Sequence, residues 1–164
     1  MHRRVVITAA LALAAAGARA QQPAIEWGQI HGTSHKAVPG NLPITVRALD
    51  DRPANVQIAR RLVDALRRTS HQIGPAAAPL TLNFDTETER VPQRLQRGIT
   101  DTRGRVKFVL TATLDETASG QRLWSGEASY LGFANEENSI FAQLAQMLVE
   151  ELGKNVRVRG FALE

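Results

Sequence analysis

The stretch RGRVKFVLTATLDETASGQRLWSGEASYL, residues 103–131, decides the fold of this chain. Both of its halves are rich in β-branched, aromatic and leucine residues, and segment 115–120 between them supplies Asp, Ser and Gly for a turn. We therefore predict a β-hairpin at the centre of a sheet. In its second strand we expect Trp124 and Tyr130 to point inward, because aromatic residues on strands are usually core; a sugar-stacking Trp124 is the alternative. Gly126 indicates a bulge or the close approach of another backbone.

Two amphipathic segments flank this hairpin, and each needs an apolar surface to cover. Residues 55–70 and 135–152 both repeat apolar residues at the i, i+3, i+4 spacing of a helix. The first stripe comprises Val56, Ala59, Leu62, Val63 and Leu66, and the second comprises Ile140, Phe141, Leu144, Leu148 and Leu152. Asp50 and Asp51 precede the first helix, where carboxylates can cap free backbone N–H groups. An acid/base or metal pair is the alternative interpretation of these two residues.

Three further segments are typical of strands. Residues 42–49 contain a β-branched run, residues 80–89 alternate apolar with polar side chains, and residues 156–161 alternate again. If 80–89 pairs antiparallel with the next strand, three acids can face three bases. The acids are Asp85, Glu87 and Glu89, and the bases are Arg103, Arg105 and Lys107. The order β-α-β-β-β-α, with a final β, predicts an α+β two-layer sandwich with both helices on one face of an antiparallel or mixed sheet.

Residues 1–20 have the three parts of a secretory signal peptide. A basic start at 1–4 precedes an apolar run at 5–17, and Ala18-Arg19-Ala20 fits a cleavage site. The apolar run is shorter than the roughly 20 residues that cross a bilayer, so we expect no membrane span. We therefore expect cleavage after Ala20 and a location in the periplasm.

Removal of the signal changes the charge of the chain. Arg3, Arg4 and Arg19 leave with it, so the formal net charge falls from +4 to +1. This balance does not favour nucleic acid as a partner. The chain has no cysteine, which excludes disulfides and a lipidated N-terminal cysteine, so a packed core must hold the mature chain together. The expected parts are a signal peptide at 1–20, an irregular N-terminal arm at 21–41 and a single α+β domain at 42–164.

Candidate binding residues gather in the connection 90–102. It carries Arg90, Arg94 and Arg97 against the single Asp101, and connections of this length are often functional or disordered. We hypothesise that these arginines bind a partner or an anionic envelope component. A solvated loop is the alternative.

The sequence shows no familiar catalytic machinery. Glycine-rich phosphate loops, G-x-S-x-G and H-E-x-x-H are all missing, so we expect no enzyme and no cofactor. His31 and His35 are the metal candidates, although their i, i+4 spacing suits a helix, which Gly32 and Pro39 disfavour. A small-ligand or metal-binding periplasmic protein is therefore the alternative function.

The layout resembles a group of small bacterial envelope accessory proteins. The resemblance rests on the export signal, the helix segment ARRLVDAL (59–66), the strand segment LWSGEA (123–128) and the closing segment 144–156, and it covers residues 42–159. The group includes the lipopolysaccharide-assembly lipoprotein, the auxiliary lipoproteins of ABC-type envelope transporters and several uncharacterised periplasmic families. This chain departs from those lipoproteins by lacking the lipidated cysteine. The resemblance implies a non-catalytic periplasmic accessory or adaptor domain that binds another cell-envelope protein or complex.

Overall fold

The computed structural model describes residues 27–91 and 104–163. Their elements are β1 (Gly28–Ser34), β2 (Ile44–Ala48), α1 (Pro53–Arg68), β3 (Leu80–Arg90), β4 (Arg105–Glu116), β5 (Arg122–Phe133), the short 3₁₀ helix η2 (Ala134–Glu136), α2 (Glu137–Glu150) and β6 (Val156–Phe161). The predicted signal peptide lies outside these ranges. Within them, neither helix combines the length and the hydrophobicity that crossing a membrane requires.

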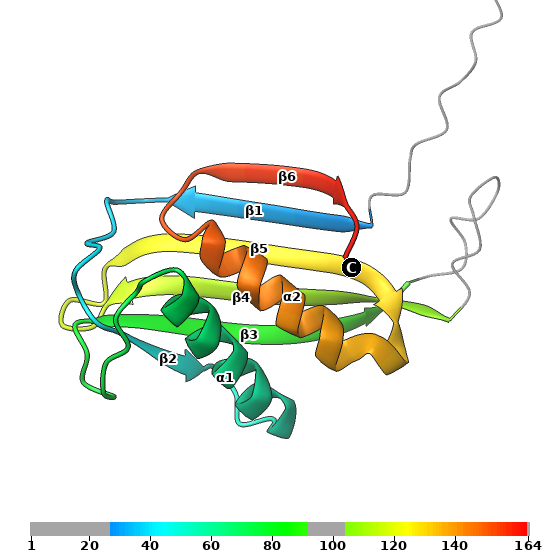
Figure 1. Ribbon diagram of the computed structural model, residues 1–164, viewed down its shortest axis with the longest axis horizontal. Coiled ribbons are helices and arrows are strands. Elements are labelled where there is room, and N and C mark those ends of the chain that lie inside the picture. Colours follow the sequence, from blue (N-terminus) through cyan, green and yellow to red (C-terminus); the bar gives the residue numbers. More distant parts are fainter. Residues whose placement is uncertain (1–26, 92–103, 164) are drawn as a thin grey trace, which may run out of the picture.

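The six described strands form one sheet in the order β2-β3-β4-β5-β1-β6 (Figure 1). β2 and β3 are parallel, because α1 carries the chain back along the sheet between them. Every other neighbouring pair is antiparallel. Both helices cover the same face of this mixed sheet. The α+β two-layer sandwich expected from the sequence is therefore confirmed, with β1 as an additional strand.

The range 21–41, where we expected an irregular arm, contains β1. This strand lies between β5 and β6 and is therefore an inner strand of the sheet. Two of its glycines make room for neighbouring side chains: the ring of Phe161 covers Gly28, and a Cβ on Gly32 would lie 3.0 Å from the side chain of Val156. Glycines in this role interrupt the apolar alternation by which a strand is recognised.

The central hairpin of β4 and β5 forms as the sequence predicts. Trp124 is fully buried, and its indole N–H donates a hydrogen bond to the carbonyl oxygen of Lys154 at 3.1 Å, so a sugar-stacking Trp124 is excluded. Tyr130 also points inward, and its ring stacks on Phe161 with 6.2 Å between centroids. The ring of Trp124 occupies the space where a Cβ of Gly126 would lie. Gly126 therefore accommodates a side chain and not another backbone.

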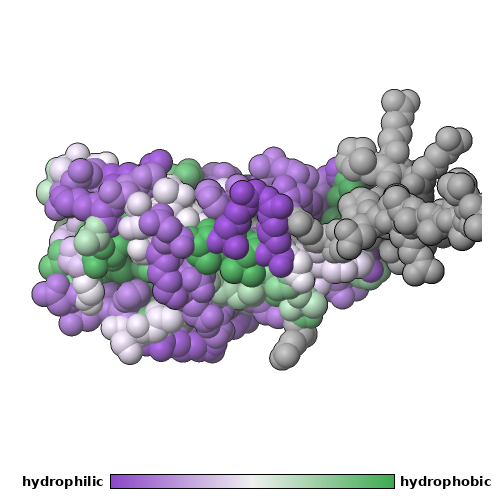
Figure 2. All heavy atoms as spheres, turned by 90° about the horizontal axis from the view of Figure 1, so that it is seen from above, coloured by the Kyte–Doolittle hydropathy of each residue, from purple (hydrophilic) through white to green (hydrophobic). Residues whose placement is uncertain are grey.

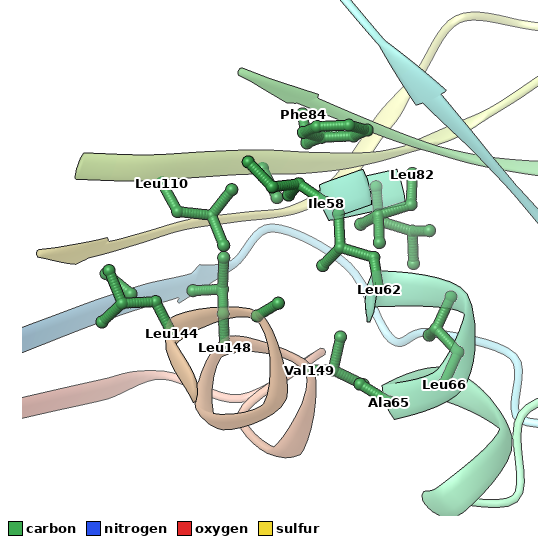
Figure 3. Packing of buried hydrophobic residues seen from close by; sticks show 14 of the residues in the cluster. Ile58, Leu62, Ala65, Leu66, Leu82, Phe84, Leu110, Leu144, Leu148 and Val149 are labelled. Atoms are coloured by element: carbon green, nitrogen blue, oxygen red, sulfur yellow. The ribbon is translucent and has the colours of Figure 1, made fainter. Parts of the chain in front are cut away.

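The main core lies between the helices and the sheet. Figure 3 shows Leu62 of α1 pointing toward Leu82 of β3, while Leu148 of α2 points toward Leu110 of β4 and Leu144 lies one turn away on the same helix. All five of these side chains are at most 1% exposed. Full burial of a leucine side chain stabilises a fold by about 1.5–3 kcal/mol, so this cluster fixes both helices on the sheet.

α1 turns a different face to the core than the apolar pattern predicts. Its buried residues are Asn55, Ile58, Leu62, Ala65 and Leu66. Val56, which we expected in the core, is 57% exposed, and Ala59 and Val63 are only half-buried. The helix carries apolar residues on two adjacent stripes, and contact with α2 and β3 selects the stripe that is buried.

Asp50 ties the start of α1 to its surroundings without acting as the helix cap. The N-cap residue is Arg52, whose side chain makes no capping hydrogen bond. Asp50 accepts hydrogen bonds from the backbone N–H of Arg52, at 3.2 Å, and from the side-chain amide of Asn55. The guanidinium of Arg52 also donates to Asp85 on β3 at 2.7 Å. Asp50 thus belongs to a structural network that joins α1 to β3, and the expected capping role is corrected, because the N-cap residue is Arg52.

One of the predicted acid–base pairs between β3 and β4 forms. β3 and β4 pair antiparallel as expected, and Lys107 lies opposite Glu89 with 3.5 Å between Nζ and Oε2. Asp85 and Glu87 instead lie opposite uncharged residues of β4. Arg103 lies outside the described residues, and the guanidinium of Arg105 contacts the rings of Trp27 and Phe133. The register of the strands, set by the buried face, places neither Asp85 nor Glu87 opposite Arg105.

Candidate functional site

The sheet ends in two edge strands, and β6 is the more exposed of them. Its burial pattern leaves the middle of the strand exposed, including Val158 at 38%. An edge strand presents unpaired backbone N–H and C=O groups to which another chain can add. Figure 2 looks from above Figure 1 onto this edge and shows hydrophilic side chains over most of it, with apolar patches between them. β6 is therefore a possible attachment point for an extended segment.

A row of three charged or titratable side chains crosses the helix-free face beside this edge. His31 of β1 pairs in register with Glu127 of β5 on one side and with Arg157 of β6 on the other. All three are exposed. Their neighbour Ile30 is buried against the helices, and alternation along a strand sends adjacent side chains to opposite faces. The three side chains therefore lie side by side on the outer face.

A shallow hollow lies over this row. It has a volume of about 280 Å³, and its polar lining comprises Gln29, His31, Glu127, Arg157 and Arg159. Two guanidinium groups, an imidazole and one carboxylate can bind both carboxylates and amides of a peptide. The arrangement suits recognition of a polar segment, and the hollow holds no nucleophile with an adjacent base.

The arginines predicted to bind a partner are not part of this hollow. Arg90 is the last residue of β3, is exposed, and lies opposite Val106 of β4. β3 is separated from β1 by β4 and β5. Arg94 and Arg97 lie outside the described residues, so a binding role for the three arginines stays a prediction.

The two histidines proposed for a metal site are not brought together. His31 lies on the outer face of β1, whereas His35 follows the end of that strand and has Nε2 3.0 Å from Oγ of Ser125. Four residues of extended strand span about 13 Å, which is too far for two ligands of one ion. In the described part of the chain, no three His, Cys, Asp or Glu side chains gather in a way that could hold a metal.

Sequence reasoning did not single out Glu127, Arg157 or Arg159 as binding residues. The available signal was the alternation Val-Arg-Val-Arg at 156–159, which predicts a strand with one strongly basic face. Its neighbours on β1 and β5 come from distant parts of the chain, so only the sheet order brings the row together.

The comparisons with known proteins establish a fold and no family. No family model matches this chain, and no curated protein matches it. Among solved structures, the chain is similar to the PelC dodecamer from Paraburkholderia phytofirmans, with a TM-score of 0.55 and 19% identity over 79% of this chain and 99% of that chain. It is also similar to a PDZ domain protein from Parabacteroides distasonis, with a TM-score of 0.55 and 11% identity.

The second similarity covers 80% of this chain but 39% of that one, so this chain spans well under half of the PDZ domain protein. A minor lipoprotein from Acinetobacter baumannii gives a TM-score of 0.38 at 14% identity, over 68% of this chain and 85% of that chain. That TM-score is too low to indicate a shared fold. The first two similarities show that the architecture occurs in other bacterial proteins.

Proposed function

We propose that this chain is an exported, non-catalytic accessory domain that binds another protein of the cell envelope along β6. The observation that carries the proposal is the exposed edge of β6, with the polar hollow directly beside it. An extended segment of the partner would add to this edge as a further strand. Backbone hydrogen bonds then supply affinity, and the side chains at the hollow supply specificity.

The charges at this edge favour an acidic partner segment. Arg157 and Arg159 alternate with Val158 along β6, so both arginines flank the path of an added strand. Across two neighbouring strands, opposite charges contribute roughly 0.2–1 kcal/mol per pair, and complementary charge raises the rate of association. Glu127 lies two strands away from the edge and can meet a basic group only at the far side of the hollow.

Three further observations support an envelope role. Residues 1–20 have the pattern of a signal peptide, and the layout resembles envelope accessory proteins. The similar PelC chain is a dodecamer, which supports a role in protein assemblies for a chain of this fold.

A photocrosslinking experiment in cells tests the proposal. A photoreactive amino acid replaces Val158 on β6 in one strain and Gln57, an exposed residue of α1, in the control strain. We expect one dominant envelope protein to be captured from position 158 and not from position 57. Arg157→Glu with Arg159→Glu should reduce the product at least about tenfold, given the charge dependence of such contacts. Capture of the same products from both positions, or no product above background, would refute the proposal.

A further inference from the structure

A second apolar stripe on α1 is left uncovered at the opposite edge of the sheet. Val56, Ala59 and Val63 face β2 and not the core. They line two adjoining hollows of about 490 and 340 Å³, to which β2 adds Ala48 and Val46. Val56 is 57% exposed. Apolar side chains gathered beside an open strand edge are typical of an interaction surface.

The described ends of this chain do not reach that stripe. In Figure 1, the described chain starts at β1 and ends after β6, and both strands lie on the side of the sheet opposite to β2, with β6 as the edge strand. The described residues at these two ends therefore do not cover the stripe.

The geometry of the stripe is self-complementary. Val46 is the middle residue of β2, and it lines the same hollow as Ala59 and Val63, which lie at the middle of α1. A twofold axis through Val46 therefore passes beside the centre of the helix. It would pair two β2 strands antiparallel, with Arg47 of each copy opposite Thr45 of the other. That pairing avoids placing like charges opposite one another.

The helices meet under the same symmetry. Ala59 and Val63 of α1 line one hollow with Val46 of β2. Since strands of one sheet lie about 4.8 Å apart and packed helices about 8–10 Å apart, pairing of the β2 edges would place the two α1 helices side by side. In an antiparallel α1 pair centred between Ala59 and Val63, Ala59 of each copy faces Val63 of the other. Asp64 of one copy then faces Arg60 of the other. Asp64 is weakly engaged in the single chain, with 3.9 Å to Arg67.

We propose that a second copy of this chain covers the stripe and forms a twofold dimer through β2 and α1. An isologous contact of this kind is the commonest symmetry among homo-oligomers. The dimer uses a different edge of the sheet and a different partner from the proposed envelope contact at β6. Either proposal can therefore be refuted without the other.

Sedimentation velocity of the purified exported chain over roughly 1–300 µM tests the dimer, a range suited to a small interface. We expect a reversible dimer whose dissociation constant rises at least about tenfold with Val56→Asp and with Asp64→Arg, because each change puts an unpaired or like charge into the contact. Combining Arg60→Asp with Asp64→Arg should restore dimerisation to within about threefold of the original, because the ion pair is rebuilt in reverse. Val56 and Asp64 are exposed, and circular dichroism checks that these variants fold.

A thiol crosslink tests the symmetry directly. The chain has no cysteine, so Val46→Cys places one thiol per copy beside the twofold axis, and a short bis-maleimide should join two copies. Val158→Cys on β6 is the matched control and should stay monomeric under the same conditions. A chain that is monomeric throughout the concentration range, a dimer that withstands both Val56→Asp and Asp64→Arg, or crosslinking at position 158 in place of 46 would overturn the proposal. Loss of the dimer in Val56→Asp should leave capture of an envelope partner at position 158 unchanged.

Discussion

The guanidinium carbon of Arg105 lies 4.3 Å from the centre of the Trp27 ring. The centre of the Phe133 ring lies 4.4 Å from the same carbon. These contacts join a residue just before β1 to the start of β4 and the end of β5. Arg105 therefore does not form the pair with an acid of β3 that the sequence predicts. The Nε atom of Arg105 is buried without a hydrogen-bond partner among the described residues, so the aromatic rings are its main contacts.

We expect Arg105→Lys to lower stability although it keeps the positive charge. A lysine ammonium cannot stack as a planar group between two rings, and cation–π contacts contribute about 0.5–2 kcal/mol each. Urea unfolding measures the change. Lys107→Ala is the control, since its exposed ion pair with Glu89 should contribute less than about 1 kcal/mol. Equal losses in the two variants would show that stacking is unimportant.

The buried pair of Thr86 and Asn55 predicts a second stability effect. The hydroxyl of Thr86 donates to Oδ1 of Asn55 at 2.8 Å, and both residues are less than 5% exposed. Thr86→Val keeps the shape but leaves the amide oxygen without this donor, which should cost about 1–3 kcal/mol. The exposed Thr88→Val on the same strand should change the free energy of unfolding by less than about 0.5 kcal/mol. A neutral Thr86→Val would mean that another donor replaces the hydroxyl.

His71 should make stability depend on pH. Partial burial lowers the pKa of His71 below its ordinary value of 6.5. The unfolded chain then binds a proton at a higher pH than the folded chain does. This contribution to stability is therefore complete above the unfolded pKa and is lost as the pH falls through it. Between about pH 8 and about pH 5.5, the urea midpoint should fall more for the original chain than for His71→Gln. Equal falls would contradict this role for His71.

The connection 90–102 carries a prediction about anion binding. Arg90, Arg94 and Arg97 changed together to Ser should abolish binding to anionic lipid vesicles or lipopolysaccharide and leave the melting temperature unchanged, because the hypothesis assigns them no packing role. Flotation with vesicles measures binding, and an equal loss of charge on α1, at Arg60, Arg61 and Arg67, is the control. Unchanged binding of the first variant would retire the hypothesis.

Export of the chain can be tested at its N-terminus. Mass spectrometry of the protein from the periplasmic fraction should find Gln21 as the first residue. Ala20→Leu should block processing, because the cleavage site requires a small residue at that position. An N-terminus at Met1 in the original chain would refute the predicted signal peptide.

Local patterns in the sequence were sufficient to predict most elements of the sheet and both helices. The alternation at 80–89, the hairpin at 103–131 and the apolar stripe of α2 each indicate a buried face. Apolar side chains on a buried face recur along the sequence with the period of the strand or helix that carries them. The fold class followed from the order of these elements.

Only the tertiary structure decided the details on which a function depends. Both apolar stripes of α1 satisfy the helical repeat, and packing against α2 selected the one with Ile58 over the one with Val56. The sequence pattern did not predict β1, because Gly28 and Gly32 interrupt its apolar alternation and leave space for side chains of β6. His31, Glu127 and Arg157 lie far apart in the sequence and meet only because β1 inserts between β5 and β6. Such contacts between distant strands depend on sheet order and register, which no local repeat encodes.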